Sequence, residues 1–297
     1  MYQISCESTV DLPDSLMRAR GIPVLRYAYA VDGREYEDDM GRDPDSLTRF
    51  YGFLAEGKLP TTSQLTACQY EAFFEPLLRQ GDLIHVVFSS GLSGSFNGAQ
   101  VAARALRERY PDRRLTVVDS LCASGGYGML VDGLADMKDR GAGMEEAEAW
   151  LLQNRLRVNH QFFSTDLRYY RRTGRVSGAA AAIGSVLGIC PIMRLDENGR
   201  IIAYDKVRGK AQAMRRTLDA ALARAENGAE YAGKIWIGHS NCPEDAERLM
   251  RMAKESFPKA KDLQIFNIGV VVASHSGPNT VSMYFFGDER TAGKRSV

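Results

Sequence analysis

The sequence predicts an α/β protein with two domains, an N-terminal domain built on a parallel sheet and a C-terminal mixed α+β domain. Its 297 residues are enough for two domains. In the first half, short apolar runs alternate with amphipathic stretches, as in a parallel sheet whose strands are joined by helices. In the second half, two apolar runs meet across the turn ENG, which favours an antiparallel hairpin. We place the boundary after the helical stretch MEEAEAWLLQNRL, which gives domains of residues 1–157 and 158–297.

Strands and helices follow one another in the first domain. Apolar runs predict four strands, which are YQISCES, IPVLRYAYAV, DLIHVVFSS and RLTVVDS. The run LIHVVF is almost continuously apolar, as burial on both faces of a sheet requires. Amphipathic stretches, some of which begin at Asp or Ser and end at Gly, predict helices. These are DLPDSLMRARG, DPDSLTRFYGFLAEG, QYEAFFEPLLRQG, NGAQVAARALRERY, GYGMLVDGLADMKDRG and MEEAEAWLLQNRL.

The second domain has a different pattern. Two long amphipathic stretches, AQAMRRTLDAALARAENG and PEDAERLMRMAKESF, predict helices. The apolar runs predict strands, which are NHQFFST, ICPIMRLD, GRIIAYDKV, KIWIGHS, LQIFNIGVVVASHS and TVSMYFFG. The uncharged segment GAAAAIGSVLGICPIM, residues 178–193, is rich in Ala and Gly and too short to span a membrane. It can form a closely packed buried helix, or its small side chains can line an apolar ligand, or both.

Composition and charge exclude several classes of function. A net charge of +1 gives no general attraction to nucleic acid or to an anionic membrane. The N-terminus lacks the basic start and apolar core of a signal peptide, and no run reaches the roughly 18 apolar residues of an integral membrane segment. The five cysteines are scattered and form no CxxC pair, so we expect neither a disulfide framework nor a metal site. We therefore expect a cytoplasmic protein whose thiols are buried or half-buried.

The turn SSGLSGS, residues 89–95, joins a predicted strand to a predicted helix. Backbone N–H groups at the start of a helix lack internal partners and carry partial positive charge, so a phosphate or carboxylate can bind there. The glycine spacing fits neither the dinucleotide fingerprint nor a P-loop, and the last glycine of a GxSxG nucleophile elbow is missing. Ser93 or Ser95 can instead cap the helix, which still leaves other hydroxyls for a ligand.

A second group of hydroxyls lies before another helix, in LPTTSQLTACQ. Thr66 and Gln69 form a T-x-x-Q capping box, which gives Thr66 a structural role. Thr61, Thr62 and Ser63 upstream have no such role. They are either plain turn residues or the second part of a ligand site.

Histidine and arginine side chains supply further candidates. His85 lies inside an apolar run and is expected in the core, whereas His275 ends a predicted strand, where functional groups on loops gather. The stretch YYRRTGR places Arg172 and Arg175 around a glycine turn. These arginines form a solvated basic face or bind carboxylate or phosphate oxygens, which suit the guanidinium group.

Six motifs occur in an order and spacing that resemble the DegV family, which includes the fatty-acid-binding subunits of bacterial fatty acid kinase. They are STVDL, TTSQ, SSGLSGS, VVDS, LRYYRRTGRVS and ASHSGPNT. The resemblance implies a DegV-like fold of two domains with a long-chain fatty acid, such as palmitate, buried between them. It also implies a lipid-binding protein of lipid metabolism that is not itself an enzyme and needs no cofactor.

The resemblance assigns roles to four residues. Thr62 of the TSQ motif and Ser93 of the LSGT-like motif would hold the carboxylate. Arg175 and His275 would lie near the head group. The protein would then present the bound acid to a kinase catalytic subunit, which forms an acyl phosphate.

The chain departs from the family pattern at several positions. Cys6 and Glu7 replace the usual Thr-Asp, Ser95 replaces the threonine of LSGT, and Thr173 and Asn279 replace glycines. None of these changes removes a proposed contact with the ligand.

Two other functions remain open. Ser93 could be the nucleophile of a hydrolase or acyltransferase with His275 as its base, although the sequence offers no clear acid to orient that histidine. Alternatively, SSGLSGS could hold the phosphate of a sugar phosphate or nucleotide in an enzyme.

Overall fold

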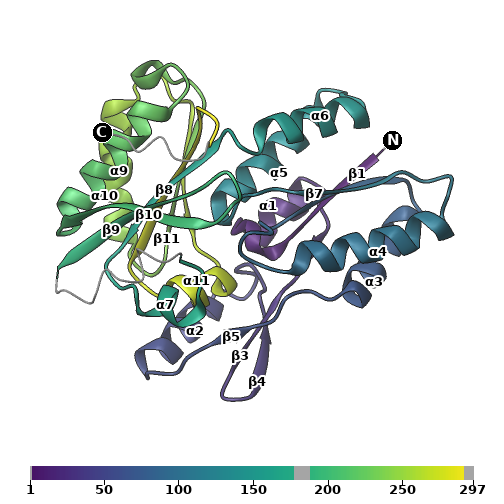
Figure 1. The fold of residues 1–297 in the computed structure, drawn as a ribbon, viewed down its shortest axis with the longest axis horizontal. Helices are drawn as coiled ribbons and strands as arrows, with labels where there is room; N and C mark the ends of the chain where they lie inside the picture. The colour runs from purple at the N-terminus through teal and green to yellow at the C-terminus, as the bar shows by residue number, and fades with distance from the viewer. Residues whose placement is uncertain (1, 177–187, 291–297) are drawn as a thin grey trace.

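A sheet of four parallel strands organises the first half of the chain (Figure 1). The computed structural model describes residues 2–176 and 188–290. The strands lie in the order β2, β1, β6, β7 and every pair is parallel. Their bounds are Tyr2–Glu7 for β1, Val24–Leu25 for β2, Asp82–Val87 for β6 and Leu115–Asp119 for β7. The predicted parallel α/β sheet is therefore confirmed.

Helices cover both sides of this sheet. Figure 1 shows α3 and α4 on one side and α5 and α6 on the other. The helices of this half are α1 (Asp14–Ala19), α2 (Ser46–Ala55), α3 (Ala67–Leu78), α4 (Ser95–Arg109), α5 (Ser124–Asp139) and α6 (Met144–Asn154), with a 3-10 turn η1 at Ser8–Val10. The capping box predicted before α3 is confirmed, because the Thr66 side chain accepts from Gln69 N–H and the Gln69 side chain accepts from Thr66 N–H.

The stretch IPVLRYAYAV does not form the single strand that its apolar pattern predicts. It divides into β2 and β3 (Ala28–Val31), because Tyr27 leaves the parallel sheet and its N–H donates to Ser8 Oγ at 3.1 Å. Strand β3 joins a separate three-stranded sheet with β4 (Arg34–Glu37) and β5 (Thr61–Thr62). The turn between β3 and β4 is Asp32–Gly33, with φ of 51° and 80°, as a two-residue hairpin loop requires.

The second half is built on a six-stranded mixed sheet in the order β10, β9, β8, β13, β11, β12. The strands are β8 (Val158–Ser164), β9 (Ile189–Leu195), β10 (Ile201–Arg208), β11 (Lys234–His239), β12 (Asp262–Asn267) and β13 (Thr280–Phe286). Only β11 and β12 pair in parallel among these described strands, and β9 and β10 form the antiparallel hairpin predicted at ENG. The helices α9 (Lys210–Arg224) and α10 (Pro243–Ser256) pack against this sheet, and a 3-10 turn η2 lies at Gly228–Glu230. The predicted mixed α+β architecture is confirmed.

The prediction of a strand over VVVASHS is wrong. This stretch forms the helix α11 (Val270–Ser276), which begins after an extended Gly269. Three β-branched residues lower helix propensity by only a fraction of a kcal/mol each, so tertiary burial can override the local preference. Val270, Val271 and Ala273 are buried against residues of the first half such as Phe50. His275 therefore lies on a helix and not at the end of a strand.

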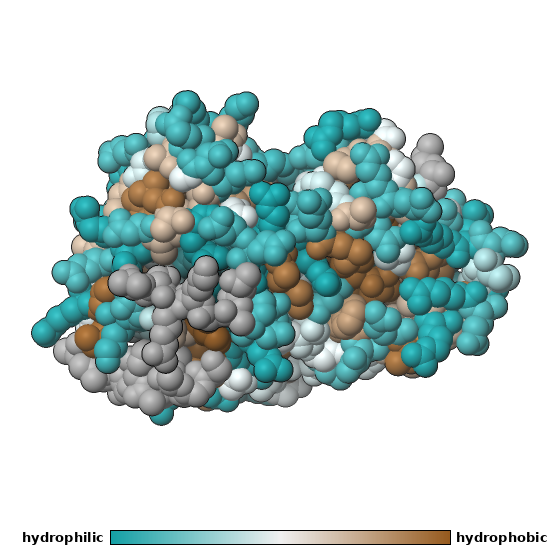
Figure 2. Space-filling model, turned by 45° about the horizontal axis from the view of Figure 1, so that its top comes forward, coloured by the Kyte–Doolittle hydropathy of each residue, from teal (hydrophilic) through white to brown (hydrophobic). Residues whose placement is uncertain are grey.

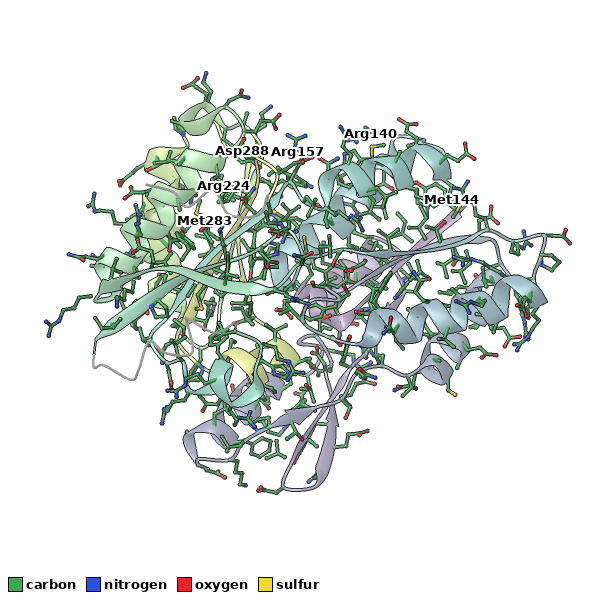
Figure 3. All side chains as sticks on the ribbon, viewed as in Figure 1. Arg140, Met144, Arg157, Arg224, Met283 and Asp288 are labelled. Carbon is green, nitrogen blue, oxygen red and sulfur yellow. The ribbon has the colours of Figure 1, made fainter. Side chains whose placement is uncertain are left out.

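The two sheets share a hydrophobic core. Helix α5 contacts β1 of the parallel sheet and also β8, β11 and β13 of the mixed sheet. As a result Ile4, Val131, Trp236 and Tyr284 belong to one buried cluster. Figure 3 shows Arg157, Arg224 and Asp288 close together beside the mixed sheet, and there Arg224 Nε donates to Asn159 Oδ1 at 2.8 Å.

The segment GAAAAIGSVLGICPIM falls largely outside the described residues. Residues 178–187 are not described, so the prediction that they pack as a helix or line a ligand stays untested. The rest of the segment consists of Gly188 and the first five residues of β9. Before it lies the short helix α7 (Arg168–Thr173), which ends at Gly174 in the left-handed conformation with φ of 67°.

The surface is mostly hydrophilic, with hydrophobic groups in small patches on the face shown in Figure 2. Across residues 2–176 and 188–290, no helix combines the length and apolar character needed to cross a membrane. The same residues contain no group of three or more His, Cys, Asp or Glu side chains suited to a metal ion. Cys68 is exposed, contrary to the expectation of buried or half-buried thiols, and the other four cysteines are buried.

Candidate functional site

A cavity of about 190 Å³ lies between the two halves of the chain. Its walls come from η1, β5, the start of α5 and loops of the first half, and from strands, loops, α7 and α11 of the second half. Apolar and aromatic side chains form much of the wall, among them Phe88, Leu92, Phe162, Tyr170, Leu195, Ile268, Val271, Val272 and Tyr284. A mainly apolar cavity with a few polar groups is typical of a site for an apolar ligand with one polar end.

All four predicted site residues line this cavity: Thr62, Ser93, Arg175 and His275. A more polar and more open hollow adjoins it, lined by Ser90, Arg200 and other residues. Ser93 and Arg175 belong to both spaces. These two side chains therefore stand where the apolar interior meets the open hollow.

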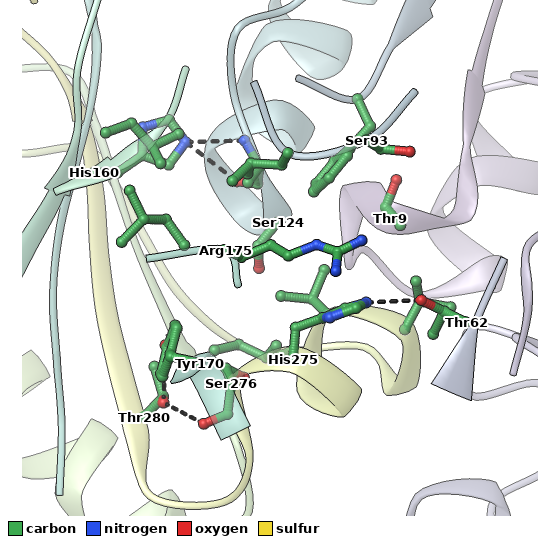
Figure 4. A pocket seen from close by; sticks show the side chains of 18 of the residues that line it. Thr9, Thr62, Ser93, Ser124, His160, Tyr170, Arg175, His275, Ser276 and Thr280 are labelled. Atoms are coloured by element: carbon green, nitrogen blue, oxygen red, sulfur yellow. Dashed lines mark hydrogen bonds between the residues drawn. The ribbon is translucent and has the colours of Figure 1, made fainter. Parts of the chain in front are cut away.

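Thr62 lies on strand β5. Its place in TTSQ, before a predicted helix, had suggested a loop instead. It pairs with Tyr29 of β3, and the alternation of side chains along a strand turns Thr61 outward and Thr62 toward the cavity. Thr62 Oγ1 lies 2.7 Å from His275 Nε2, and Figure 4 shows this hydrogen bond. The bond joins a strand of the first half to α11 of the second half.

His275 is neutral near pH 7. Burial, and then the positive charges of Arg175 and Arg172, lower the pKa of its imidazole from 6.5 to about 4. A neutral imidazole carries one N–H, so either Nε2 or Nδ1 is the donor. Nε2 faces Thr62, while Nδ1 is buried without a hydrogen-bond partner in the described part of the chain. A ligand in the cavity could supply that missing partner.

Ser93 lies in the loop between β6 and α4, and its hydroxyl is 3.0 Å from Ser95 Oγ. Ser95 N–H donates to Ser93 Oγ at 3.3 Å. No contact of this kind links Ser93 to His275 among the described residues, because the histidine bonds Thr62 instead. The arrangement thus differs from the hydrogen-bonded nucleophile and base of a serine hydrolase.

Most backbone amides of SSGLSGS donate to other groups of the protein, which leaves fewer of them for an anion than the sequence suggests. Ser90 N–H donates to Asp119 Oδ1 at 3.1 Å, Gly91 N–H to Ser89 Oγ at 3.2 Å, and Leu92 and Ser93 N–H to Ser89 O. The VVDS motif supplies Asp119, which also accepts from Leu121 N–H. The amides of Ser90, Gly91, Leu92 and Ser93 are therefore not free for a ligand, whereas the Ser93 hydroxyl lines the cavity.

Two glycines of this loop allow close approach of other segments. A Cβ on Gly91 would lie 2.4 Å from Asn198 O in the β9–β10 hairpin, and one on Gly94 would lie 2.1 Å from Gln64 Oε1 of the TTSQ stretch. At Gly91 the neighbour is backbone, so a larger residue would push the hairpin away, whereas at Gly94 the Gln64 side chain would have to turn aside. The glycines of SSGLSGS thus bring the parts of the site together.

Two arginines of the YYRRTGR stretch occupy different places. The guanidinium of Arg172 donates to Pro60 O at 2.9 Å and Ser274 O at 3.1 Å, so it ties the TTSQ stretch to α11. Arg175 is exposed, and its guanidinium donates to Thr173 O. Figure 4 shows the Arg175 side chain extending toward the side of the cavity that carries Thr9 and Thr62.

Several further polar residues at or behind the cavity wall were not predicted as site residues, among them Thr9, Tyr27 and Ser95. Thr9 and Tyr27 line the cavity, and the buried Thr9 hydroxyl has no partner within the described part of the chain. Ser95 lies behind Ser93 and is completely buried. The motif STVDL is a signal that could have pointed to Thr9, since it contains that residue. Tyr27 gives no such signal, because it lies in an apolar run that reads as a strand.

A model of the DegV family, described as a family of uncharacterised proteins, matches residues 1–288. The chain belongs to the DegV family. A DegV domain-containing protein of Clostridium perfringens is 34% identical over 290 residues, which cover 97% of this chain and 98% of that one. The family resemblance inferred from six sequence motifs is therefore confirmed.

Solved structures have the same fold. A DegV family protein of Thermus thermophilus, described by its fatty acid binding, is 27% identical with a TM-score of 0.86, covering 97% of this chain and 99% of that one. A DegV lipid-binding protein of Thermotoga maritima is 25% identical with a TM-score of 0.84, covering 98% and 99%. The fatty acid kinase B3 protein of Streptococcus pneumoniae, loaded with linoleic acid, is 22% identical with a TM-score of 0.82, covering 97% and 100%. At that identity the likeness concerns the fold alone.

Proposed function

We propose that this DegV protein binds a long-chain fatty acid in the cavity between residues 1–157 and 158–297, and that Thr62 and Ser93 hold its carboxylate. The observation that carries the proposal is one cavity with an apolar wall and both hydroxyls on it. The fatty acid binding described for the related Thermus thermophilus protein supports the same ligand class. We expect it to act as a lipid-binding protein of the cytoplasm and not as an enzyme.

The energetics divide the work between the two ends of the ligand. Burial of the ~14 methylenes of palmitate contributes roughly 11 kcal/mol before the cost of association is subtracted. A hydroxyl that donates to a carboxylate adds about 1.5–3 kcal/mol. The acyl chain would therefore supply most of the affinity, while Thr62 and Ser93 would fix the position of the head group.

Extraction of the purified protein followed by mass spectrometry tests the ligand class. We expect a co-purified fatty acid of roughly C14–C20, and we expect the Thr62→Ala/Ser93→Ala protein to carry much less of it. A phosphorylated metabolite in place of the fatty acid would contradict the proposal. So would a ligand-bound structure whose carboxylate lies more than about 4 Å from both hydroxyls, because no hydrogen bond spans that distance.

We further propose that the protein presents the acid to a kinase subunit for acyl phosphate formation. Ser93 and Arg175 border both the cavity and the open polar hollow, so a carboxylate held there would be within reach of a second protein. An acyl phosphate carries more negative charge than the acid. Arg175 and His275 would then act mainly on the phosphorylated head group or the docked kinase, by charge-assisted hydrogen bonds.

The Arg175→Ala variant separates presentation from binding. We expect its dissociation constant for free fatty acid to stay within about tenfold of the wild-type value, a change of at most about 1.4 kcal/mol. Acyl phosphate formation with a cognate kinase should fall much further. Arg168→Ala is a matched control, because Arg168 is an exposed arginine of the neighbouring α7 that pairs with Asp166. Loss of free-acid binding in Arg175→Ala as severe as in the Thr62/Ser93 double variant would contradict this division. If no ATP-dependent partner phosphorylates the bound acid, the kinase proposal fails, and storage or transport of the fatty acid is the remaining role.

A further inference from the structure

A chain of buried hydrogen bonds leads from Glu7 to Ser93. Glu7 ends β1 and is completely buried. Its Oε2 accepts from Phe88 N–H at 2.9 Å, and its Oε1 accepts from the Tyr70 hydroxyl. The Tyr27 hydroxyl lies 3.4 Å from Glu7 Oε2 but only 2.7 Å from Ser95 Oγ. The shorter contact indicates that Tyr27 donates its proton to Ser95.

This direction fixes the role of Ser95. A hydroxyl has one proton and can accept two hydrogen bonds. Ser95 Oγ accepts from Tyr27 and also from Leu65 N–H at 3.0 Å. Both acceptor positions are then filled, so Ser95 must donate its own proton to Ser93, 3.0 Å away.

The same count applies to Ser93. Its Oγ accepts from the Ser95 hydroxyl and from Ser95 N–H at 3.3 Å. With both acceptor positions filled, its proton is the one hydrogen-bonding capacity left, and it can point into the cavity, which both Ser93 and the nearby Tyr27 line. A carboxylate offers only acceptors and fits this requirement. An alcohol oxygen can also accept this proton, but the bond to the charged carboxylate is roughly twice as strong.

We propose that Tyr27 and Ser95 are positioning residues that fix Ser93 as a hydrogen-bond donor, and that they thereby select a carboxylate over an alcohol head group. The inference rests on the proposed binding of a fatty acid. It adds a reason for the selection that the contact of Ser93 alone does not give. Without Tyr27 the chain could reverse, and Ser93 could accept a hydrogen bond as readily as donate one.

The test compares two buried phenols that both contact Glu7. Tyr27→Phe removes the donor to Ser95, whereas Tyr70→Phe removes only a donor to Glu7. The dissociation constants of palmitate and hexadecanol are measured for each protein by displacement of a fluorescent fatty acid. We expect the preference for the acid to fall about tenfold in Tyr27→Phe, about 1.4 kcal/mol, and to stay within about twofold of wild type in Tyr70→Phe.

A spectroscopic readout distinguishes positioning from a loss of stability. The carbon-13 shift of carboxyl-labelled palmitate gives the pKa of the bound acid, which a donor to the carboxylate lowers. We expect this pKa to rise by about one unit in Tyr27→Phe and to be unchanged in Tyr70→Phe. An unchanged pKa and preference in Tyr27→Phe, equal changes in both variants, or tighter palmitate binding in Tyr27→Phe would overturn the proposal. Tighter binding would mean that Tyr27 donates to Glu7 instead.

A second pair of variants keeps the test decisive if Tyr27→Phe does not fold. Ser95→Thr retains a hydroxyl at this position and should preserve the preference for the acid, whereas Ser95→Ala should lose it. Equal preferences in these two variants would also overturn the proposal. If the wild-type protein binds neither ligand, the proposed fatty acid function fails, and if it binds palmitate without preference over hexadecanol, only the positioning inference fails.

Discussion

The two hydroxyls proposed to hold the carboxylate are supported in different ways. The Ser93 hydroxyl contacts Ser95 Oγ, which accepts hydrogen bonds from Leu65 N–H and from Tyr27. Thr62 is backed by a neutral His275, which has two alternative positions for its single proton. One hydroxyl thus has a fixed donor, while the other belongs to a pair that can rearrange.

This difference suggests how one site can select a carboxylate and still adjust when the head group changes. Ser93, Ser95, Tyr27 and Leu65 all belong to the first half of the chain, and the hydrogen bonds among them lie within that half. The bond between Thr62 and His275 joins the two halves. Its length and proton position therefore depend on α11 and on the charges of Arg172 and Arg175. We expect Ser93 to fix the carboxylate and the Thr62–His275 pair to respond to the state of the head group.

Removal of both hydroxyls should have the largest effect. In Thr62→Ala/Ser93→Ala the carboxylate loses two donors worth about 1.5–3 kcal/mol each, so palmitate affinity should fall by at least about a hundredfold. Displacement of a fluorescent fatty acid measures this loss. Methyl palmitate, which has no charged oxygen, serves as the control ligand, and its affinity should fall much less. An equal loss for acid and ester would mean that the variant protein has lost its cavity and not its donors.

The Thr62–His275 pair should make stability depend on pH. Because the imidazole pKa falls from 6.5 to about 4 on folding, the unfolded state binds more protons between these values. Stability should therefore decline as pH falls from 6.5 to 4, by roughly 3 kcal/mol in total. Urea unfolding of delipidated wild type and His275→Gln at several pH values measures the difference. Other buried groups titrate in both proteins, and parallel pH profiles would contradict the assignment.

The single variants should differ from each other. Ser93→Ala removes the fixed donor and should weaken palmitate binding by roughly ten- to a hundredfold. Thr62→Val leaves His275 Nε2 without its partner, so the imidazole N–H can turn to the ligand, and the loss should stay below about tenfold. The same displacement measurement compares them. A larger loss in Thr62→Val than in Ser93→Ala would reverse the comparison.

Thr9 should give the smallest effect. Its buried hydroxyl has no partner among the described residues, so the protein without ligand carries an unsatisfied polar group. Replacement by the isosteric valine should stabilise that form by about 1 kcal/mol. Urea unfolding of delipidated protein measures the change, with Thr61→Val as an exposed threonine control that should change little. Destabilisation by Thr9→Val would show that the hydroxyl has a partner.

The sequence by itself determined the order of the elements and the segments that carry the site. Alternation of apolar runs and amphipathic stretches predicted the parallel sheet, the turn ENG predicted the β9–β10 hairpin, and the T-x-x-Q pattern predicted the cap of α3. These features follow from local spacing. The four residues assigned from the family resemblance, Thr62, Ser93, Arg175 and His275, all line one cavity, while their roles toward a ligand stay predictions.

Only the tertiary structure decided what each of these groups contacts. The Val-rich run of α11 has a local preference for strand, and burial against the first half makes it a helix that carries His275 to Thr62. The amides of Ser90, Gly91, Leu92 and Ser93 could bind an anion by their sequence position, but in the fold they donate to Asp119 and Ser89. The apolar pattern predicts only that Tyr27 lies in a strand, whereas in the fold its hydroxyl contacts Ser95, 68 positions away in the chain. Periodicity reports which residues are buried, whereas hydrogen-bond partners depend on distances between segments that local sequence does not encode.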